Sequence, residues 1–545
     1  MKQIVMVQKS SLEKVFGSQT GLQADCPRGG CLRGEEFGYQ LVLRLEEFLF
    51  RQPFRISVES PLGDAVSLFT VDTVPCEFTA YPNMHDEHYL SLEPGLFPDL
   101  LTPLTEDTLE LSPYLNTVVW VNISVPRDCP AGEYPVKVVV EGRDRQAEST
   151  FTLKVIPAEL PKQKLLCTQW FYADCLADRY GVEIYSPAHW KLLEEYLRLA
   201  AARGMNMVLT PALTPALNTA VGHERPCTQL LEIEKDGECY RFDFGRLRRF
   251  MEMARACGIE NFEFSHLFSQ WGARFAPNIY VAEQGERKRV FGWDTPADSP
   301  AYRGFLDQLL PQLTAFLKEM GALGHAVFHI SDEPGEKDLE SYRTAREMVA
   351  GHLREFPIID ALSDVKFYDM GLVETPVATT DHIEPFLERK VPGLWTYYCC
   401  AQSREVANRF LSMPSYRNRI IGLQLYKFGL TGFLHWGYNF WYTWDSRKQV
   451  DPFRFGDAGG MFPGGDSFLV YPGEDGPLES LRLKVFHHAM QDVQALELLE
   501  SLAGREEALR VIDADNTLTF RNYPHSAQAL LDARERVNAA LAALV

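Results

Sequence analysis

The sequence lacks the motifs that mark metal centres and disulfide-stapled folds. Its eleven cysteines include no CxxC pair, since Cys26 and Cys31 stand five positions apart and Cys399 and Cys400 are adjacent. No HxH or HExxH motif occurs either. These absences argue against a zinc ribbon and a disulfide framework. We therefore expect reduced, mostly buried thiols, with no metal and no cofactor.

Long apolar runs and excess positive charge are also missing. No stretch approaches the roughly 20 apolar residues of a membrane span, and the apolar run at 4–7 is shorter than the about 7–15 residues of a secretory signal. Acidic residues outnumber basic ones by 74 to 54, a formal net charge of −20. A uniformly acidic surface repels phosphate backbones and anionic lipids. We expect a cytoplasmic protein that binds neither nucleic acid nor membranes, and a homo-oligomer is left open.

The first part of the chain has the pattern of an all-β domain. With 545 residues the chain exceeds one ordinary core, which predicts two or three domains. Apolar and β-branched residues predict strands at 117–125, 136–142 and 151–157. Strands at this spacing predict an antiparallel β-sandwich over residues 1–160. The proline-containing segment 157–164 is the expected linker.

From residue 161 to 480 strands alternate with helices. The expected strands are 165–171, 206–211, 261–268, 325–334, 357–364, 376–382, 393–400 and 431–440. Eight buried strands with intervening helices predict an α/β fold, a (β/α)8 TIM-type barrel. Leucine and alanine at three- and four-residue spacing predict that 481–545 forms C-terminal helices packed on the barrel.

Two adjacent acids end the fourth barrel strand. In AVFHISDEP (326–334) apolar residues give way to Asp332 and Glu333, and barrel active sites lie at such strand ends. Two neighbouring carboxylates repel each other, so burial favours a protonated acid beside an ionised one, as general acid catalysis requires. The alternative is that Asp332 caps the next helix and Glu333 is solvated. The opposing aromatic strand ends favour the catalytic interpretation.

The seventh strand, GLWTYYCC (393–400), carries no acid, and the eighth is followed by none until Asp445. A retaining glycosidase with two carboxylates needs its nucleophile about 5–5.5 Å from the acid. A 2-acetamido group on the substrate can replace that nucleophile by attacking its own anomeric carbon.

Four segments resemble glycoside hydrolase family 123: HISDEP, LWTYY, GFLHWGYNFW and GDSFLVYPG. The resemblance implies a β-sandwich followed by a catalytic (β/α)8 barrel. It also implies a β-N-acetylgalactosaminidase-like enzyme that uses retaining, substrate-assisted hydrolysis on a small oligosaccharide or glycoside. By the match to SDEP, Asp332 would orient the acetamido group and Glu333 would be the general acid/base.

Ten further residues at or just beyond barrel strand ends are candidates for substrate binding: Trp170, His266, His329, Trp395, Tyr397, His435, Trp436, Tyr438, Asn439 and Asp466. Aromatic rings stack on sugars, and dense Trp and Tyr polar groups need partners if buried. Barrel packing is the alternative for Trp395 and turn formation for Asp466. For His266 and His329 a hydrogen-bonded supporting role is favoured over metal ligation.

Two other functions stay open. Glu333 could act with a different carboxylate, namely Asp360, Asp364, Asp381 or Asp466, on a sugar without an acetamide. Alternatively, the chain could be a non-catalytic carbohydrate-binding relative. Retention of two acids that repel each other argues against a binding module.

Overall fold

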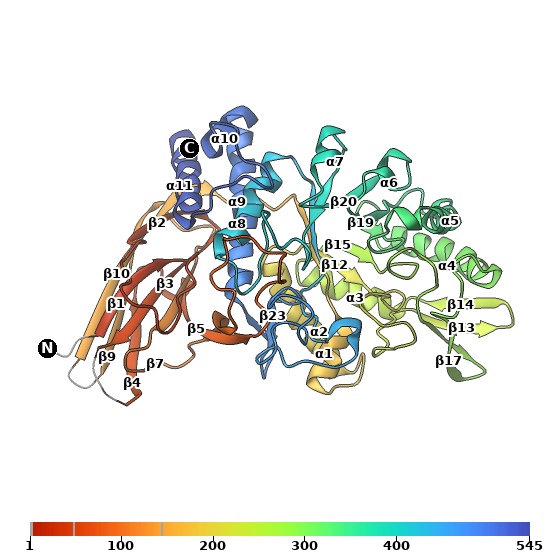
Figure 1. Ribbon diagram of the computed structural model, residues 1–545, viewed down its shortest axis with the longest axis horizontal. Coiled ribbons are helices and arrows are strands. Elements are labelled where there is room, and N and C mark those ends of the chain that lie inside the picture. Colours follow the sequence, from red (N-terminus) through yellow and green to blue (C-terminus); the bar gives the residue numbers. More distant parts are fainter. Residues whose placement is uncertain (1–3, 47–49, 143–144) are drawn as a thin grey trace.

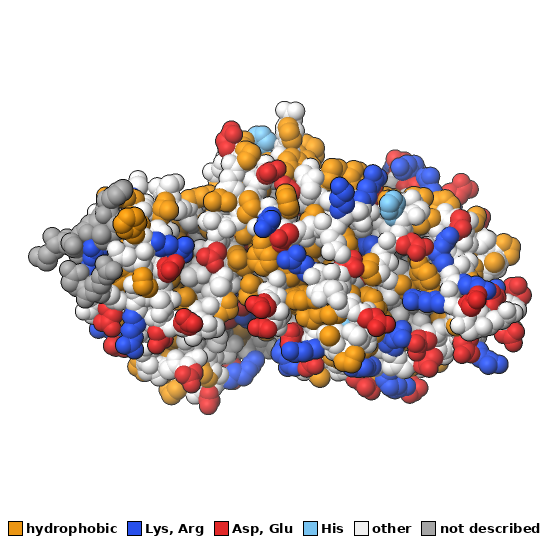
Figure 2. Space-filling view, turned by 90° about the horizontal axis from the view of Figure 1, so that it is seen from below, with side chains coloured by type: hydrophobic (Ala, Val, Ile, Leu, Met, Phe, Trp, Pro, Cys, Tyr) orange, Lys and Arg blue, Asp and Glu red, His pale blue; other side chains and the backbone are white. Residues whose placement is uncertain are grey.

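The computed structural model describes residues 4–46, 50–142 and 145–545. The N-terminal sheets form one end of an elongated molecule, and the barrel and its surrounding helices form the other (Figure 1). No helix in the described ranges is long and apolar enough to cross a membrane. Acidic and basic side chains are interspersed over the face shown in Figure 2, so the net negative charge is not gathered there into one patch.

Two five-stranded sheets, antiparallel apart from the β10–β2 pair, pack face to face in the N-terminal part. The first has the order β1 (Ile4–Ser10), β3 (Glu36–Leu45), β8 (Thr117–Ser124), β5 (Val66–Cys76) and β6 (Gly95–Pro103). The second has the order β2 (Arg28–Arg33), β10 (Arg145–Glu159), β9 (Gly132–Gly142), β4 (Gln52–Glu59) and β7 (Thr108–Leu111). Tyr39 of one sheet stacks on Phe151 of the other, with ring centroids 4.2 Å apart. Their contact lies in the core that joins the sheets.

Eight parallel strands form a nearly closed barrel in the second part of the chain. In chain order they are β11 (Leu166–Gln169), β12 (Met207–Thr210), β15 (Asn261–Phe264), β18 (Ala326–Phe328), β19 (Ile359–Leu362), β20 (Thr375–Thr379), β21 (Trp395–Tyr397) and β22 (Gly432–His435). The two edge strands of the sheet are β18 and β19, and a single parallel bridge between Phe328 and Ile358 joins them. The apolar runs predicted all eight strands because each is buried on both faces. The observed strands are shorter, and β18 ends at Phe328, so the acid pair lies in the following loop.

Helices follow the barrel strands, as the alternation predicts. They are α1 (Ala173–Tyr180), α2 (Pro187–Ala202), α3 (Gly245–Ala256), α4 (Pro300–Glu319), α5 (Leu339–Ala350), α6 (Lys366–Asp369), α7 (Glu384–Glu388) and α8 (Ser415–Lys427). The Ser186 hydroxyl caps α2 by accepting the His189 N–H at 3.3 Å. Gly204 just beyond that helix has φ +87°, a conformation that favours glycine.

A small four-stranded sheet stands beside the barrel. One of its hairpins is β13 (Glu232–Asp236) with β14 (Cys239–Asp243). A second hairpin, β16 (Ile279–Glu283) with β17 (Glu286–Phe291), joins it and was not predicted from the sequence. Further along the chain, β23 (Val470–Pro472) and β24 (Pro477–Glu479) form a short pair.

The C-terminal helices contact both halves of the molecule. They are α9 (Leu481–Ala503), α10 (Arg505–Ile512) and α11 (Ala527–Leu544), and α9 packs along α8. Arg482 of α9 makes a bidentate pair with Asp99 of β6, with both N–O distances 2.9 Å. In α11, Asn538 donates to the Gly30 carbonyl at 2.9 Å. These buried contacts fix the sheets of the N-terminal part against the barrel.

Candidate active site

The carboxyl ends of the barrel strands open into a cavity of about 370 Å³. Strand ends and the loops beyond them supply most of its wall, the usual place for the active site of a parallel barrel. The lining residues are Tyr81, Trp170, Asn218, Trp271, Asp332, Glu333, Ala361, Tyr397, Cys399, Cys400, Leu434, Trp436, Trp444, Met461 and Phe462.

The backbone after β18 turns both acids into this cavity. Successive side chains of an extended strand point to opposite faces, but Glu333 has a left-handed conformation with φ +43°. That break in the alternation allows neighbouring side chains to line one cavity. The Trp271 N–H donates to the Asp332 carbonyl at 2.8 Å and helps to hold the turn. A left-handed residue other than glycine costs about 1 kcal/mol or more, so the surrounding structure must hold it in place.

Both carboxyl groups of the pair have raised pKa values. Burial raises the pKa of Asp332 well above its usual range, and the charge of Glu333 adds to the shift. Glu333 stays accessible through the mouth of the cavity, yet the protein around it desolvates its carboxylate and raises its pKa. A hydrogen bond from the Tyr397 hydroxyl to Glu333 Oε1, 2.5 Å long, opposes this rise. The pair can therefore retain a proton that isolated carboxyl groups would release.

A buried network of charged side chains supports the floor of the cavity. The Trp170 indole N–H donates to Glu263 Oε1 at 2.7 Å. His329 donates from Nε2 to the same oxygen at 2.7 Å and from Nδ1 to Asp360 Oδ1 at 3.1 Å. Burial alone would lower the pKa of His329, but its hydrogen bonds to the two carboxylates raise it to about 10. A charged imidazole thus anchors the wall that carries Trp170.

The same network contains the one group of potential metal ligands in the described ranges. His266, His329 and Asp360 bring ligand atoms within 4.8 Å of one another. A protonated imidazole that donates from both nitrogens has no lone pair to offer a metal. His266 stacks on His329 with ring centroids 4.3 Å apart, and burial followed by the neighbouring charge lowers its pKa well below the usual range. His329 is therefore a hydrogen-bonded support, whereas neither ring nitrogen of His266 has a hydrogen-bond partner among the described residues.

A second buried cluster supports Trp436, which follows the neighbouring strand β22. The Trp436 indole N–H donates to Asp466 Oδ2 at 2.9 Å. Burial raises the pKa of Asp466 to about 7 against the charge of Arg409. Arg409 donates to His435 Nδ1 at 2.7 Å, so that nitrogen carries the lone pair. Both indoles of the inner cavity are therefore oriented by buried carboxylates.

Three of the ten candidate binding residues line the cavity, namely Trp170, Tyr397 and Trp436. The other seven lie behind the wall or elsewhere. His266, His329, His435 and Asp466 belong to the supporting clusters, and Trp395 packs over Gly432. The Tyr438 hydroxyl donates to the Tyr196 carbonyl at 3.1 Å. The Asn439 side chain bridges the backbone N–H and carbonyl of Tyr172.

Several lining residues were not found from the sequence because they lie on loops without periodicity. Trp271 and Trp444 follow β15 and β22, and Tyr81 comes from the loop between β5 and β6 of the N-terminal sheets. The Tyr81 hydroxyl donates to the Met461 carbonyl at 3.1 Å. Tryptophan in a loop just after a barrel strand is the signal that could have indicated the first two. Tyr81 carries no such signal.

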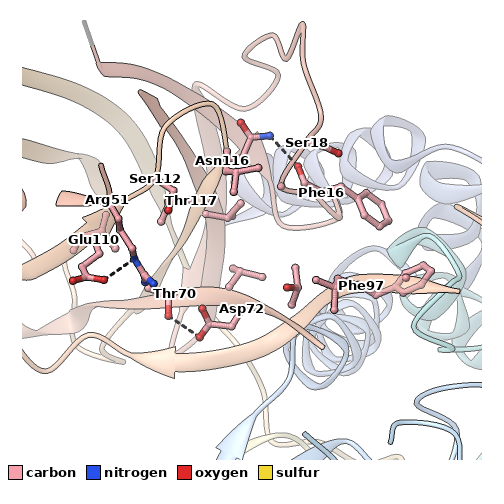
Figure 3. Close-up of a pocket in the computed structure, with 18 of the residues that line it drawn as sticks. Phe16, Ser18, Arg51, Thr70, Asp72, Phe97, Glu110, Ser112, Asn116 and Thr117 are labelled. Atoms are coloured by element: carbon pink, nitrogen blue, oxygen red, sulfur yellow. Dashed lines mark hydrogen bonds and ion pairs between the residues drawn. The ribbon is translucent and has the colours of Figure 1, made fainter. Parts of the chain in front are cut away.

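A larger cavity, of about 960 Å³, lies in the N-terminal part (Figure 3). Several of its polar side chains are paired with one another. Arg51 contacts Glu110 at 2.6 Å, and the Thr70 hydroxyl donates to Asp72 at 3.0 Å. Asn116 is directed at the Phe16 carbonyl, 2.9 Å away. No pair of adjacent carboxylates lines this hollow within the described part of the chain.

Aromatic walls suit a neutral sugar ring, and cleavage of an acetal needs a carboxyl group that keeps its proton. Barrel and cavity together thus have the properties of a glycoside hydrolase. A family model described as the catalytic domain of glycoside hydrolase 123 matches residues 170–499, and the chain belongs to that family. Among curated proteins, none matches the sequence significantly.

A solved structure shares this fold. A family 123 glycoside hydrolase from Clostridium perfringens, described for glycolipid glycan hydrolysis, has a TM-score of 0.75 and 15% identity. The match covers 99% of this chain and 98% of that one. A Rhizomucor miehei family 5 mannosidase reaches only a TM-score of 0.33 at 10% identity, covering 64% of this chain and 96% of that one.

Proposed function

We propose that this chain is a retaining exo-glycosidase that removes a terminal β-linked 2-acetamido sugar, such as N-acetylgalactosamine, by substrate-assisted catalysis. One observation carries the proposal. Among the lining residues in the described ranges, Asp332 and Glu333 are the only carboxylates. The acids that could act as an enzyme nucleophile, Asp360, Asp364, Asp381 and Asp466, are not part of the lining. The substrate's own amide is then the available nucleophile.

In the first step Asp332 accepts the acetamido N–H and directs the amide oxygen at the anomeric carbon. The amide oxygen bonds to that carbon while the glycosidic bond breaks. The Glu333 carboxyl transfers its proton to the departing oxygen, so an alcohol leaves. The remaining sugar is a cyclic oxazolinium ion, whose positive charge faces the Asp332 carboxylate. The pKa values of both acids are raised, so the pair holds a proton, which the mechanism requires on Glu333 at the start.

In the second step the Glu333 carboxylate accepts a proton from water. The water oxygen bonds to the anomeric carbon, the ring of the intermediate opens and the acetamido group is regenerated. Two displacements at one carbon retain its configuration. Tyr397 donates to Glu333 and stabilises its ionised form between the steps. Trp170 and Trp436, each oriented by a buried carboxylate, provide the apolar walls for the sugar.

The partner that this chemistry requires is a small oligosaccharide or glycoside. The Clostridium perfringens relative acts, by its description, on glycans of glycolipids. We extend from it only the class of ligand, a glycan, and the terminal acetamido sugar follows from the mechanism proposed above.

Paired aryl β-glycosides test the mechanism. We expect cleavage of the 2-acetamido substrate and little cleavage of its 2-hydroxy counterpart. Among acetamides carrying one, two or three fluorines the rate should fall stepwise, because the amide oxygen becomes a poorer nucleophile. Equal rates across the fluorinated series, with cleavage rate-limiting, would refute substrate assistance. Labelling of Asp360, Asp364, Asp381 or Asp466 by a 2-fluoro glycoside would establish the two-carboxylate mechanism instead.

A further inference from the structure

The exposed tryptophans of this protein gather at one place. Of nine tryptophans in the chain, Trp271 and Trp444 are the two most exposed, at 44% and 41%. Both line the barrel cavity, and so does Met461, which is 38% exposed. Exposed apolar surface costs free energy in proportion to its area. Three such side chains around one opening therefore indicate a binding surface.

Trp271 is fixed in position next to the acid pair. Its backbone is left-handed, with φ +57°, which is uncommon for a bulky side chain. The Trp271 N–H donates to the Asp332 carbonyl at 2.8 Å, and the next two N–H groups donate to the Ser331 hydroxyl. Since neighbouring loops hold this conformation, the exposed indole is presented by a rigid backbone.

Trp444 and Tyr81 are fixed by contacts between distant segments. The loop that holds Trp444 is tied to the loop after β12 by the bond from the Ala220 N–H to the Asp445 carbonyl, 3.1 Å long. The loop of residues 77–94 that carries Tyr81 is held on the barrel by Arg417, which pairs with Asp86 at 2.9 Å. The mouth of the cavity is thus built from three separate parts of the chain.

We infer that Trp271 and Trp444 form a binding site for the sugar ring of the leaving group. The inference rests on the proposed function, in which Glu333 protonates the departing oxygen. Asp332 is half-buried and Glu333 is exposed toward the mouth. A terminal sugar held at the indoles of Trp170 and Trp436 therefore places the departing oxygen beside Glu333. The leaving group then lies at the exposed indoles of Trp271 and Trp444. The C–H faces of a pyranose suit such rings.

The charge of the wall narrows the substrate class further. The lining residues include no lysine or arginine in the described part of the chain. Phosphate groups are recognised by such cations and by helix N-termini. A sugar attached to a nucleoside diphosphate would bring two phosphates to this apolar opening without a counter-charge. The site therefore selects an acetamido sugar linked to another neutral sugar.

The test measures hydrolysis of a β-linked disaccharide with a terminal 2-acetamido sugar, and inhibition by the thiazoline mimic of the cyclised sugar. The full-length variants Trp271→Ala and Trp444→Ala should each lose about 10-fold in kcat/KM on the disaccharide. Their thiazoline inhibition constants should stay within about twofold, because the mimic lacks a leaving group. Trp271→Phe should recover most of the loss. Phe455→Ala is the control, since Phe455 is 46% exposed and outside the cavity lining.

The outcomes separate the two proposals. Unchanged disaccharide kinetics in both tryptophan variants, or equal losses for disaccharide and thiazoline, would overturn the leaving-group site. Failure of the wild-type protein to bind the thiazoline would instead refute substrate assistance. The leaving-group site can then still be tested by binding, which needs no cleavage. The disaccharide affinity of Glu333→Gln is compared with that of the double variant Glu333→Gln, Trp271→Ala. Equal affinities of these two proteins would overturn the leaving-group site.

Discussion

The two large cavities of this protein differ in how their charged groups are neutralised. The cavity in the N-terminal part has more than twice the volume, but its Arg51 and Glu110 pair with each other and are both exposed to solvent. In the barrel cavity two neighbouring carboxyl groups share a space without any lining cation in the described ranges. Under the proposed function, volume does not locate the chemistry. The desolvated acid pair does, because its removal from water shifts proton affinity toward catalytic values.

The largest effect expected from this contrast is the loss of the general acid. Glu333→Gln should lower kcat on an unactivated glycoside by about 10²–10⁴-fold, with the fold retained by circular dichroism. Its matched control is Glu110→Gln in the larger cavity, which should leave kcat unchanged. Near-wild-type turnover by Glu333→Gln, or a comparable loss in Glu110→Gln, would contradict the assignment of chemistry to the barrel cavity.

Asp332→Asn should give the next largest effect. An amide at this position can still accept a hydrogen bond, but it cannot offset the positive charge of the cyclised sugar. We expect kcat to fall by about 100-fold, in line with losses of several kcal/mol when reacting groups are mispositioned. Asp72→Asn, in the larger cavity, is the matched control. Steady-state kinetics with the acetamido substrate measure both, and an Asp332→Asn enzyme with unchanged kcat would exclude the orienting role.

The parts of the molecule that could be predicted from the sequence are those with a regular apolar pattern. The barrel strands were found because buried parallel strands are continuous apolar runs, and Asp332 and Glu333 because two acids directly follow such a run. The inward or outward direction of residues beyond the strands was not predictable. β22 ends at His435, so strand alternation says nothing about Tyr438 or Asn439, which bind backbone behind the wall. Tyr81 reaches the site from another sheet, a contact that only tertiary packing creates.

A smaller effect concerns stability. Burial raises the pKa of Asp332, so the folded state holds a proton more tightly than the unfolded state. The stability that this bound proton contributes is fully present below the pKa of Asp332 in the unfolded state. It is lost as the pH rises through the pKa of Asp332 in the folded state. At neutral pH the desolvated pair thus destabilises the fold, and Asp332→Asn should raise Tm by about 1–3 °C. Asp72→Asn should not. Thermal unfolding of the wild type and of Asp332→Asn at pH 5 and pH 8 measures the difference in Tm, which should be larger at pH 8. A Tm of Asp332→Asn below that of the wild type at pH 8 would contradict the prediction.

The smallest effect separates the proton affinity of Glu333 from its position. The Tyr397 hydroxyl donates to Glu333 and lowers its pKa against the effect of burial. Tyr397→Phe removes only that donor, since the ring that lines the cavity remains. The pKa of Glu333 should then rise, and the basic limb of the kcat/KM profile should move to higher pH, because the acid stays protonated longer. We expect a loss of about 10-fold at the optimum, where a charge-assisted hydrogen bond no longer stabilises the ionised form. A basic limb that stays in place while kcat falls would show that Tyr397 contacts the substrate rather than tuning Glu333.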